Sequence, residues 1–234
     1  GWIDAPQRVG AMIAPLIGAE ADEVISADST SVNLYKLIVA ALRLNPLRNV
    51  VVSEAGNFPT DLHIAEGAVA AVAGAELRVV ERGALADALG DDTALLLLTH
   101  VHYKTAERFD MAAWTKAAHD AGALICWDLS HSAGAVAVEL NAADADMAVG
   151  CGYKYLNGGP GAPAFIYVRT DLADTVEPAL SGWLGHRAPF DFALTYQPGA
   201  GIERMRVGTP PVLQMTALEV AMQAWEDVDM QMLR

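Results

Sequence analysis

Short apolar runs alternate with alanine-rich stretches along this chain, and this alternation limits what it can fold into. Three of the alanine-rich stretches carry apolar residues at three- and four-residue spacing and predict helices over 31–43, 61–73 and 111–121. Repeated strand–helix units of this kind predict an α/β fold, a three-layer sandwich with a mostly parallel sheet covered on both faces. The predicted strands lie at 50–52, 77–80, 94–98, 124–127, 147–149 and 164–168.

Size, charge and cysteine content narrow the class of protein. A chain of 234 residues that is 53% hydrophobic and 19% charged is too apolar to be disordered, and we expect one large domain. Its net charge of −14 repels nucleic acids and anionic membranes, and no apolar run has the length of a bilayer span, so we expect neither partner. Cys126 and Cys151 lie in apolar stretches without metal-type spacing, and no signal peptide precedes them, which favours a reduced, cytoplasmic protein.

Polar residues follow the apolar runs in four places. In open α/β sheets, ligands bind outside the carboxyl ends of the strands. The four segments that end predicted strands are therefore the candidate site, at 54–61, 99–104, 128–131 and 150–157.

Lys154 lies between two glycine-rich loops and is flanked by Tyr153 and Tyr155. One interpretation is a surface lysine beside a glycine turn. The other is a desolvated amine, whose lowered pKa makes it a nucleophile toward an aldehyde cofactor that it would carry as a Schiff base.

Asp128 ends a predicted strand and precedes His131 in Asp128-Leu-Ser-His. A carboxylate at this position can pair with a pyridinium nitrogen and keep the ring protonated, so that the ring accepts electrons. The alternative is an aspartate that caps a short turn.

Two further segments have the features of a cofactor site. Hydroxyl-bearing residues at 28–33 precede a helix, and a helix N-terminus binds phosphate, although ordinary helix capping explains the same residues. Phe58 could lie over a flat ring with Asp61 pointing toward it, and a hydrophobic staple with an N-cap is the alternative. His100 and His102 could form a metal pair, but no third ligand accompanies them, and we expect no metal.

Four segments together resemble kynureninases, which are class V aminotransferase-like enzymes of pyridoxal-phosphate (PLP) fold type I. The segments are Trp127-Asp-Leu-Ser-His-Ser-Ala-Gly-Ala, Gly150-Cys-Gly-Tyr-Lys-Tyr-Leu-Asn-Gly-Gly-Pro-Gly-Ala, Gly182-Trp-Leu-Gly-His and Arg206-Val-Gly-Thr-Pro-Pro. The resemblance implies that residues 1–234 are the PLP-binding, transferase-like large domain, truncated at both ends and without the C-terminal small domain whose arginine binds the substrate carboxylate. It also implies a homodimer with shared active sites that hydrolyses a carbon–carbon bond of L-kynurenine, or 3-hydroxykynurenine, to give anthranilate and L-alanine in tryptophan catabolism.

Roles for individual residues follow from the same resemblance. Lys154 is the Schiff-base lysine, Asp128 the pyridinium partner and Tyr153 a proton relay. The remaining cofactor contacts are Phe58 stacked on the ring, Asp61 near the same ring, Thr30, Ser31 and Tyr153 at the phosphate, His131 and Thr99 around the cofactor, and Trp183 and Thr209 reaching the phosphate of the neighbouring subunit.

Two alternatives remain open. Cysteine desulfurases and selenocysteine lyases are sister families that have His before the cofactor lysine and usually Gln in the position of His131. Here Tyr153 precedes Lys154, and no reactive loop cysteine is seen, which favours a kynureninase. A non-catalytic fragment that binds the cofactor or forms a dimer is the other alternative.

Overall fold

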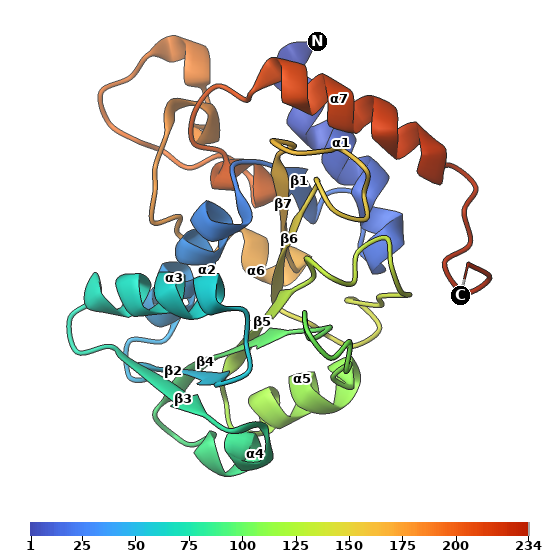
Figure 1. Cartoon of the computed structure of the whole chain (residues 1–234). Helices are drawn as coiled ribbons and strands as arrows, with labels where there is room; N and C mark the ends of the chain where they lie inside the picture. Colours follow the sequence, from blue (N-terminus) through green and yellow to red (C-terminus); the bar gives the residue numbers. More distant parts are fainter. Residues whose placement is uncertain (234) are drawn as a thin grey trace.

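The computed structural model describes residues 1–233, and Arg234, the last residue of the predicted large domain, lies outside them. One seven-stranded sheet runs through the molecule in the order β1-β7-β6-β5-β4-β2-β3 (Figure 1). β7 pairs antiparallel with β1 and β6, and the other pairs are parallel, so the predicted mostly parallel sheet is confirmed. The strands are β1 (Val24–Ser26), β2 (Val50–Glu54), β3 (Glu76–Val80), β4 (Thr93–Thr99), β5 (Leu124–Asp128), β6 (Met147–Cys151) and β7 (Ala164–Val168).

Helices cover both faces of the sheet. One core joins α2 and α3 to one face, and a second core joins α1, α5 and α7 to the other (Figure 1). Alternation along β4 shows the division, since Leu95 and Leu97 belong to the first core and Leu96 and Leu98 to the second. The three-layer sandwich is therefore confirmed. The helices are α1 (Ala5–Ile13), α2 (Thr30–Leu44), α3 (Pro59–Ala70), α4 (Leu85–Ala88), α5 (Met111–Asp120), α6 (Thr170–Ala173) and α7 (Val212–Met222).

β1 and α1 are elements that the sequence patterns did not predict. β1 has three residues, all buried, which is too short for a strand period to show. α1 packs closely against this strand, because a Cβ at Gly10 would overlap the carbonyl of Val24. Only glycine allows that approach.

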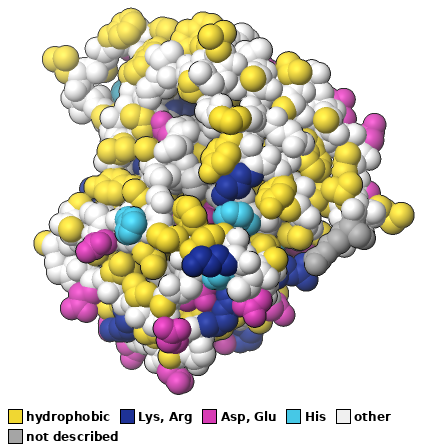
Figure 2. Space-filling model, viewed as in Figure 1, with side chains coloured by type: hydrophobic (Ala, Val, Ile, Leu, Met, Phe, Trp, Pro, Cys, Tyr) yellow, Lys and Arg dark blue, Asp and Glu magenta, His cyan; other side chains and the backbone are white. Residues whose placement is uncertain are grey.

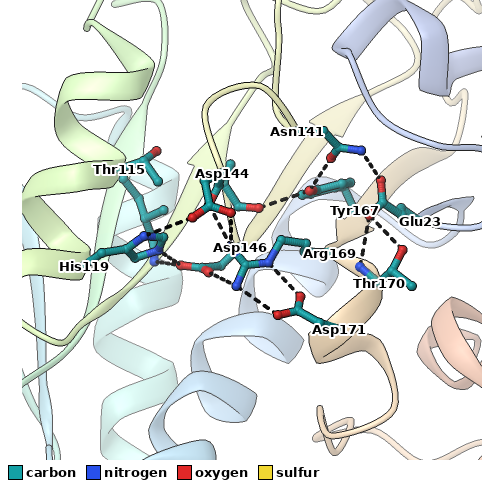
Figure 3. Close-up of polar contacts among 12 residues, drawn as sticks. Glu23, Thr115, His119, Asn141, Asp144, Asp146, Tyr167, Arg169, Thr170 and Asp171 are labelled. Carbon is teal, nitrogen blue, oxygen red and sulfur yellow. Dashed lines mark hydrogen bonds and ion pairs between the residues drawn. The ribbon is translucent and has the colours of Figure 1, made fainter.

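A polar network ties together the amino ends of β5 and β6 and the end of β7 (Figure 3). The buried carboxylate of Asp146 accepts a hydrogen bond of 2.8 Å from the Ile125 backbone and lies 2.9 Å from Nε2 of His119. Arg169 contacts Asp146 at 3.3 Å and Asp144 at 2.7 Å. The network lies at the edge opposite the carboxyl ends of β5 and β6, so we assign it a structural role.

None of the helices within residues 1–233 combines the length and the apolar character needed to cross a bilayer.

Candidate cofactor site

A cavity of about 350 Å³ opens at the carboxyl edge of the sheet. Its walls come from the start of α2, the start of α3, the end of β5 and the loop after β6. Its volume falls in the range of ~300–1,000 Å³ typical of small-molecule sites. The lining residues are Ser29, Thr30, Ser31, Phe58, Thr60, Asp61, Asp128, Ser130, Tyr153 and Lys154.

Lys154 is half-buried in the loop that joins β6 to β7. This loop turns back tightly, because Gly152 lies so close to the Pro163 carbonyl that a Cβ would overlap it. Nζ of Lys154 lies 3.0 Å from Nε2 of His131 and 5.8 Å from the centroid of the Phe58 ring. Lys154 therefore lines the cavity, as the cofactor-lysine interpretation predicts.

His131 contacts Lys154 through one ring nitrogen, and its other ring nitrogen has no hydrogen-bond partner among residues 1–233. Burial and then the positive charge of Lys154 lower the pKa of His131, which favours the neutral imidazole that can accept a proton from the lysine. The other nitrogen, Nδ1, is buried. Buried polar atoms are normally hydrogen-bonded, so this nitrogen is available to a bound ligand.

Asp61 and Asp128 form a buried acid pair at the floor of the cavity. They are 3% and 2% exposed, and Thr99 Oγ1 lies 3.2 Å from Asp61 Oδ2. Burial, and then the negative charge of Asp128, raise the pKa of Asp61 to about 9, so this carboxyl holds a proton at neutral pH. A cation at this position would remove the repulsion between the two acids, which fits a protonated ring nitrogen.

Asp128 also serves the local turn. Its Oδ1 accepts a hydrogen bond of 2.8 Å from the Ser130 backbone. The turn-capping interpretation is therefore confirmed, and Asp128 lines the cavity as well. Asp61 lies in the first turn of α3, whose N-cap is Phe58, so Asp61 itself is not the cap.

The start of α2 supplies the other end of the cavity. Ser29 is the N-cap and accepts a hydrogen bond of 3.3 Å from the Val32 backbone, so helix capping is also correct. Thr30 and Ser31 follow in the first turn and line the cavity, where their hydroxyls and the positive end of a 15-residue helix favour an anion.

Three residues near the cavity were not singled out from the sequence. Asn57 accepts a hydrogen bond from Thr99 Oγ1, and its Oδ1 also accepts one of 2.7 Å from the Phe58 backbone, so it joins β4 to the start of α3. Tyr103 packs edge-on against Phe58 at 5.2 Å between ring centroids. Ser130 lines the cavity. All three lie in segments that the strand ends had marked, but only contacts between those segments reveal their roles.

The structure places Trp183 and Thr209 outside this cavity. Trp183 is 37% exposed and lines a separate hollow of about 320 Å³ with Phe192. Thr209 is exposed and lines another small cavity, to which Asp28 also contributes. Figure 2 shows hydrophobic side chains over the upper part of this face, where the segment between α6 and α7 lies. Their predicted contact with a neighbouring subunit remains a prediction.

His100 and His102 do not lie together as a metal pair. His100 is buried edge-on against Trp127 at 5.8 Å, and burial lowers its pKa to about 4. Nδ1 of His102 instead accepts hydrogen bonds of 3.2 Å from the backbone of Lys104 and Thr105. Within residues 1–233, no three His, Cys, Asp or Glu side chains gather as a metal-binding group.

Comparison with solved structures establishes the fold. A cysteine desulfurase from Thermococcus onnurineus NA1 superposes with a TM-score of 0.78 at 21% identity, over 95% of this chain and 56% of that one. A cysteine desulfurase from Escherichia coli gives a TM-score of 0.78 at 19% identity, over 95% and 58% of the two chains. These matches confirm the predicted large-domain architecture of fold type I.

Sequence comparison establishes the family. A kynureninase from Deinococcus radiodurans is 50% identical over the whole chain, and one from Burkholderia mallei is 49% identical. The chain spans 57% and 58% of the lengths of these two curated relatives. The aminotransferase class-V family model matches residues 4–234. The chain therefore belongs to the aminotransferase class-V family, and its resemblance to kynureninases is confirmed.

Proposed function

We propose that this chain is the PLP-binding part of an enzyme that hydrolyses L-kynurenine, or 3-hydroxykynurenine, to anthranilate and L-alanine. The observation that carries the proposal is the cavity that brings the Lys154 amine, the Asp61–Asp128 acid pair and the start of α2 together. About 50% identity to kynureninases over the whole chain supports this substrate class. Because the relatives are longer, we propose, as the sequence predicts, that residues 1–234 form the large domain of such an enzyme.

The side chains that line the cavity suit the phosphate, the ring nitrogen and the flat ring of PLP. Thr30 and Ser31 at the helix start suit its phosphate, and Tyr153 lines the same cavity. Asp128, with Asp61 beside it, suits its ring nitrogen, because a carboxylate stabilises the protonated form. Phe58, whose ring lies 5.8 Å from the Lys154 amine, is placed to pack against the flat ring.

Each residue then has a defined task in the reaction. Bound PLP supplies an aldehyde carbon and a ring that accepts electrons. Lys154 would hold the aldehyde end of the cofactor, and its amine, once free, is placed to accept the α-proton of a substrate bound in the cavity. His131, 3.0 Å from Lys154 and neutral, can take up the proton that the lysine must lose to become a nucleophile. Hydrolysis of kynurenine would need water at its γ-carbonyl and a proton for the alanine carbon, and Tyr153 at the cavity wall would relay that proton.

The thiols of the chain argue against a cysteine desulfurase activity of this part. Both cysteines are free and buried, at 0% exposure for Cys126 and 4% for Cys151. Burial raises the pKa of each thiol, so neither forms a reactive thiolate readily. Free thiols also support the expected reducing, cytoplasmic compartment.

We also propose a homodimer. Trp183, Phe190, Phe192 and Leu194 are exposed apolar side chains outside the cavity, and an exposed cluster of this kind is typical of a protein interface. Sedimentation of the purified chain with and without PLP tests the assembly. A monomer at micromolar concentration under both conditions would refute it for this chain.

A three-way assay tests the function. The purified chain is incubated with PLP and either kynurenine or cysteine, and anthranilate fluorescence and sulfide release are followed in parallel. Anthranilate release supports the proposal. Sulfide release alone indicates the desulfurase alternative, and PLP binding without either product indicates the non-catalytic alternative.

A further inference from the structure

Lys36 lies in the middle of α2 and has no contact with solvent, with an exposed fraction of 0%. Its ammonium donates a hydrogen bond of 2.8 Å to Asp28 Oδ2 and one of 2.7 Å to the carbonyl of Met205. A charge enclosed in this way is costly unless its partners are well placed. Burial lowers the pKa of Lys36, and the nearby charge of Asp28 opposes that shift.

Asp28 controls how the chain enters α2. It joins β1 to the helix and has a φ of +48°, a left-handed conformation that is uncommon outside glycine. Its backbone carbonyl accepts a hydrogen bond of 3.0 Å from Ala164, so the residue is fixed on the sheet side as well. Because Ser29, Thr30 and Ser31 follow directly, the conformation of Asp28 sets where their hydroxyls lie in the cavity.

Through the Met205 carbonyl, Lys36 also contacts the segment that precedes α7. Met205 ends the 3-10 helix Gly201–Met205, and the chain continues through the buried Arg206 to Thr209. That segment and Asp28 line the same small cavity. One ammonium therefore links the start of α2 to a segment 169 residues further along the chain.

We propose that Lys36 is a positioning residue for the phosphate end of the cavity: its buried ammonium holds Asp28 in the left-handed conformation, and this places Thr30 and Ser31 to bind a phosphate monoester. The inference rests on the proposed function, because it concerns the same cavity. The same ammonium binds the Met205 carbonyl, shortly before Thr209, which is predicted to serve the neighbouring subunit. Fold stability alone does not require the charge, since apolar residues often replace buried ion pairs without loss.

The test compares PLP with pyridoxal, which lacks only the phosphate. Equilibrium titration of the full chain gives the ratio of the pyridoxal Kd to the PLP Kd, which reports phosphate recognition and not overall folding. Lys36→Met removes the ammonium at similar volume, and we expect the ratio to fall about tenfold, the effect of losing one hydrogen bond to a charged group. Pyridoxal affinity should change little.

A second variant acts on the partner. Asp28→Asn removes the negative charge, and asparagine tolerates a positive φ, so the backbone is not strained. The amide oxygen of asparagine can still accept a hydrogen bond from the buried ammonium, and the side chain at this position is 28% exposed, so a folded variant is expected. The ratio should fall here too, and the double variant should be no worse than the stronger single variant, because both changes remove the same ion pair.

Tyr167→Phe is the matched control. It removes a buried hydroxyl that donates to Asn141 Oδ1 at 2.8 Å and lies 3.0 Å from the Ala145 carbonyl, at the opposite edge of the sheet (Figure 3). It should lower stability and leave the ratio unchanged. An unchanged ratio in folded Lys36→Met or Asp28→Asn would overturn the proposed role of Lys36, and so would losses of phosphate preference that multiply in the double variant. Either result would leave the proposed function intact. If the unaltered chain does not prefer PLP to pyridoxal, the proposed phosphate site fails together with the role of Lys36.

Discussion

Replacing Asp61 with asparagine in the cofactor-free chain tests the buried acid pair. The pKa of Asp61 is raised from an ordinary 3.8 to about 9 in the folded chain, first by burial and then by Asp128. Between about pH 5 and pH 8 the folded chain therefore holds a proton that the unfolded chain has released. The stabilisation is complete below pH 3.8 and is lost as the pH rises through about 9.

The size of the effect follows from linkage. One proton held only by the folded state changes the free energy of unfolding by about 1.4 kcal/mol per pH unit. From pH 5 to pH 8 the cofactor-free chain should lose up to about 4 kcal/mol relative to Asp61→Asn, whose amide has no proton to release.

Urea unfolding at four pH values between 5 and 8 measures this difference. The quantity to plot is the free energy of unfolding of the unaltered chain minus that of Asp61→Asn, which should fall steadily with pH. Asp110→Asn makes the same chemical change at an exposed helix cap and should show no such slope. A difference between the unaltered chain and Asp61→Asn that is independent of pH would mean that Asp61 is ionised in the fold, and the reasoning would be refuted.

Two further variants test the cofactor contacts. Asp128→Ala leaves a bound ring nitrogen without its counter-ion, which costs ~3–5 kcal/mol, so kcat should fall at least about 100-fold in a steady-state assay. A loss of less than tenfold would contradict its pairing with the ring. Phe58→Leu keeps an apolar contact but removes the aromatic face, which is worth about 1 kcal/mol, so the Kd for PLP should rise about fivefold in a titration. Unchanged affinity would place Phe58 away from the ring.

Much of the fold followed from the sequence because its signals are local. Six strands and three helices were predicted near their observed positions, since the strands form apolar runs and the helices repeat apolar residues at three- and four-residue spacing. β1 could not be predicted, because three residues have no period and the strand exists through pairing with β7. α1 was missed as well, and its fit against β1 depends on the space that Gly10 leaves.

The sequence predicted most of the site residues that follow the ends of strands. The cavity is lined by Lys154, Asp128, Asp61 and the residues at the start of α2. The first three follow predicted strands, where ligands bind in open α/β sheets, and the family resemblance had indicated all of them. Lys36 was not predicted, because a lysine within a helix pattern is normally solvated and its partner Met205 is distant in sequence. Such roles depend on which segments meet, and no local pattern contains that information.

Borohydride reduction of the chain with PLP, followed by peptide mass spectrometry, tests the central claim most directly. The account predicts one pyridoxyl-phosphate group on Lys154 and none in Lys154→Ala, whose cofactor absorbance should no longer be trapped by reduction. Modification of another lysine with Lys154 left free, or the same trapped absorbance in Lys154→Ala, would contradict it.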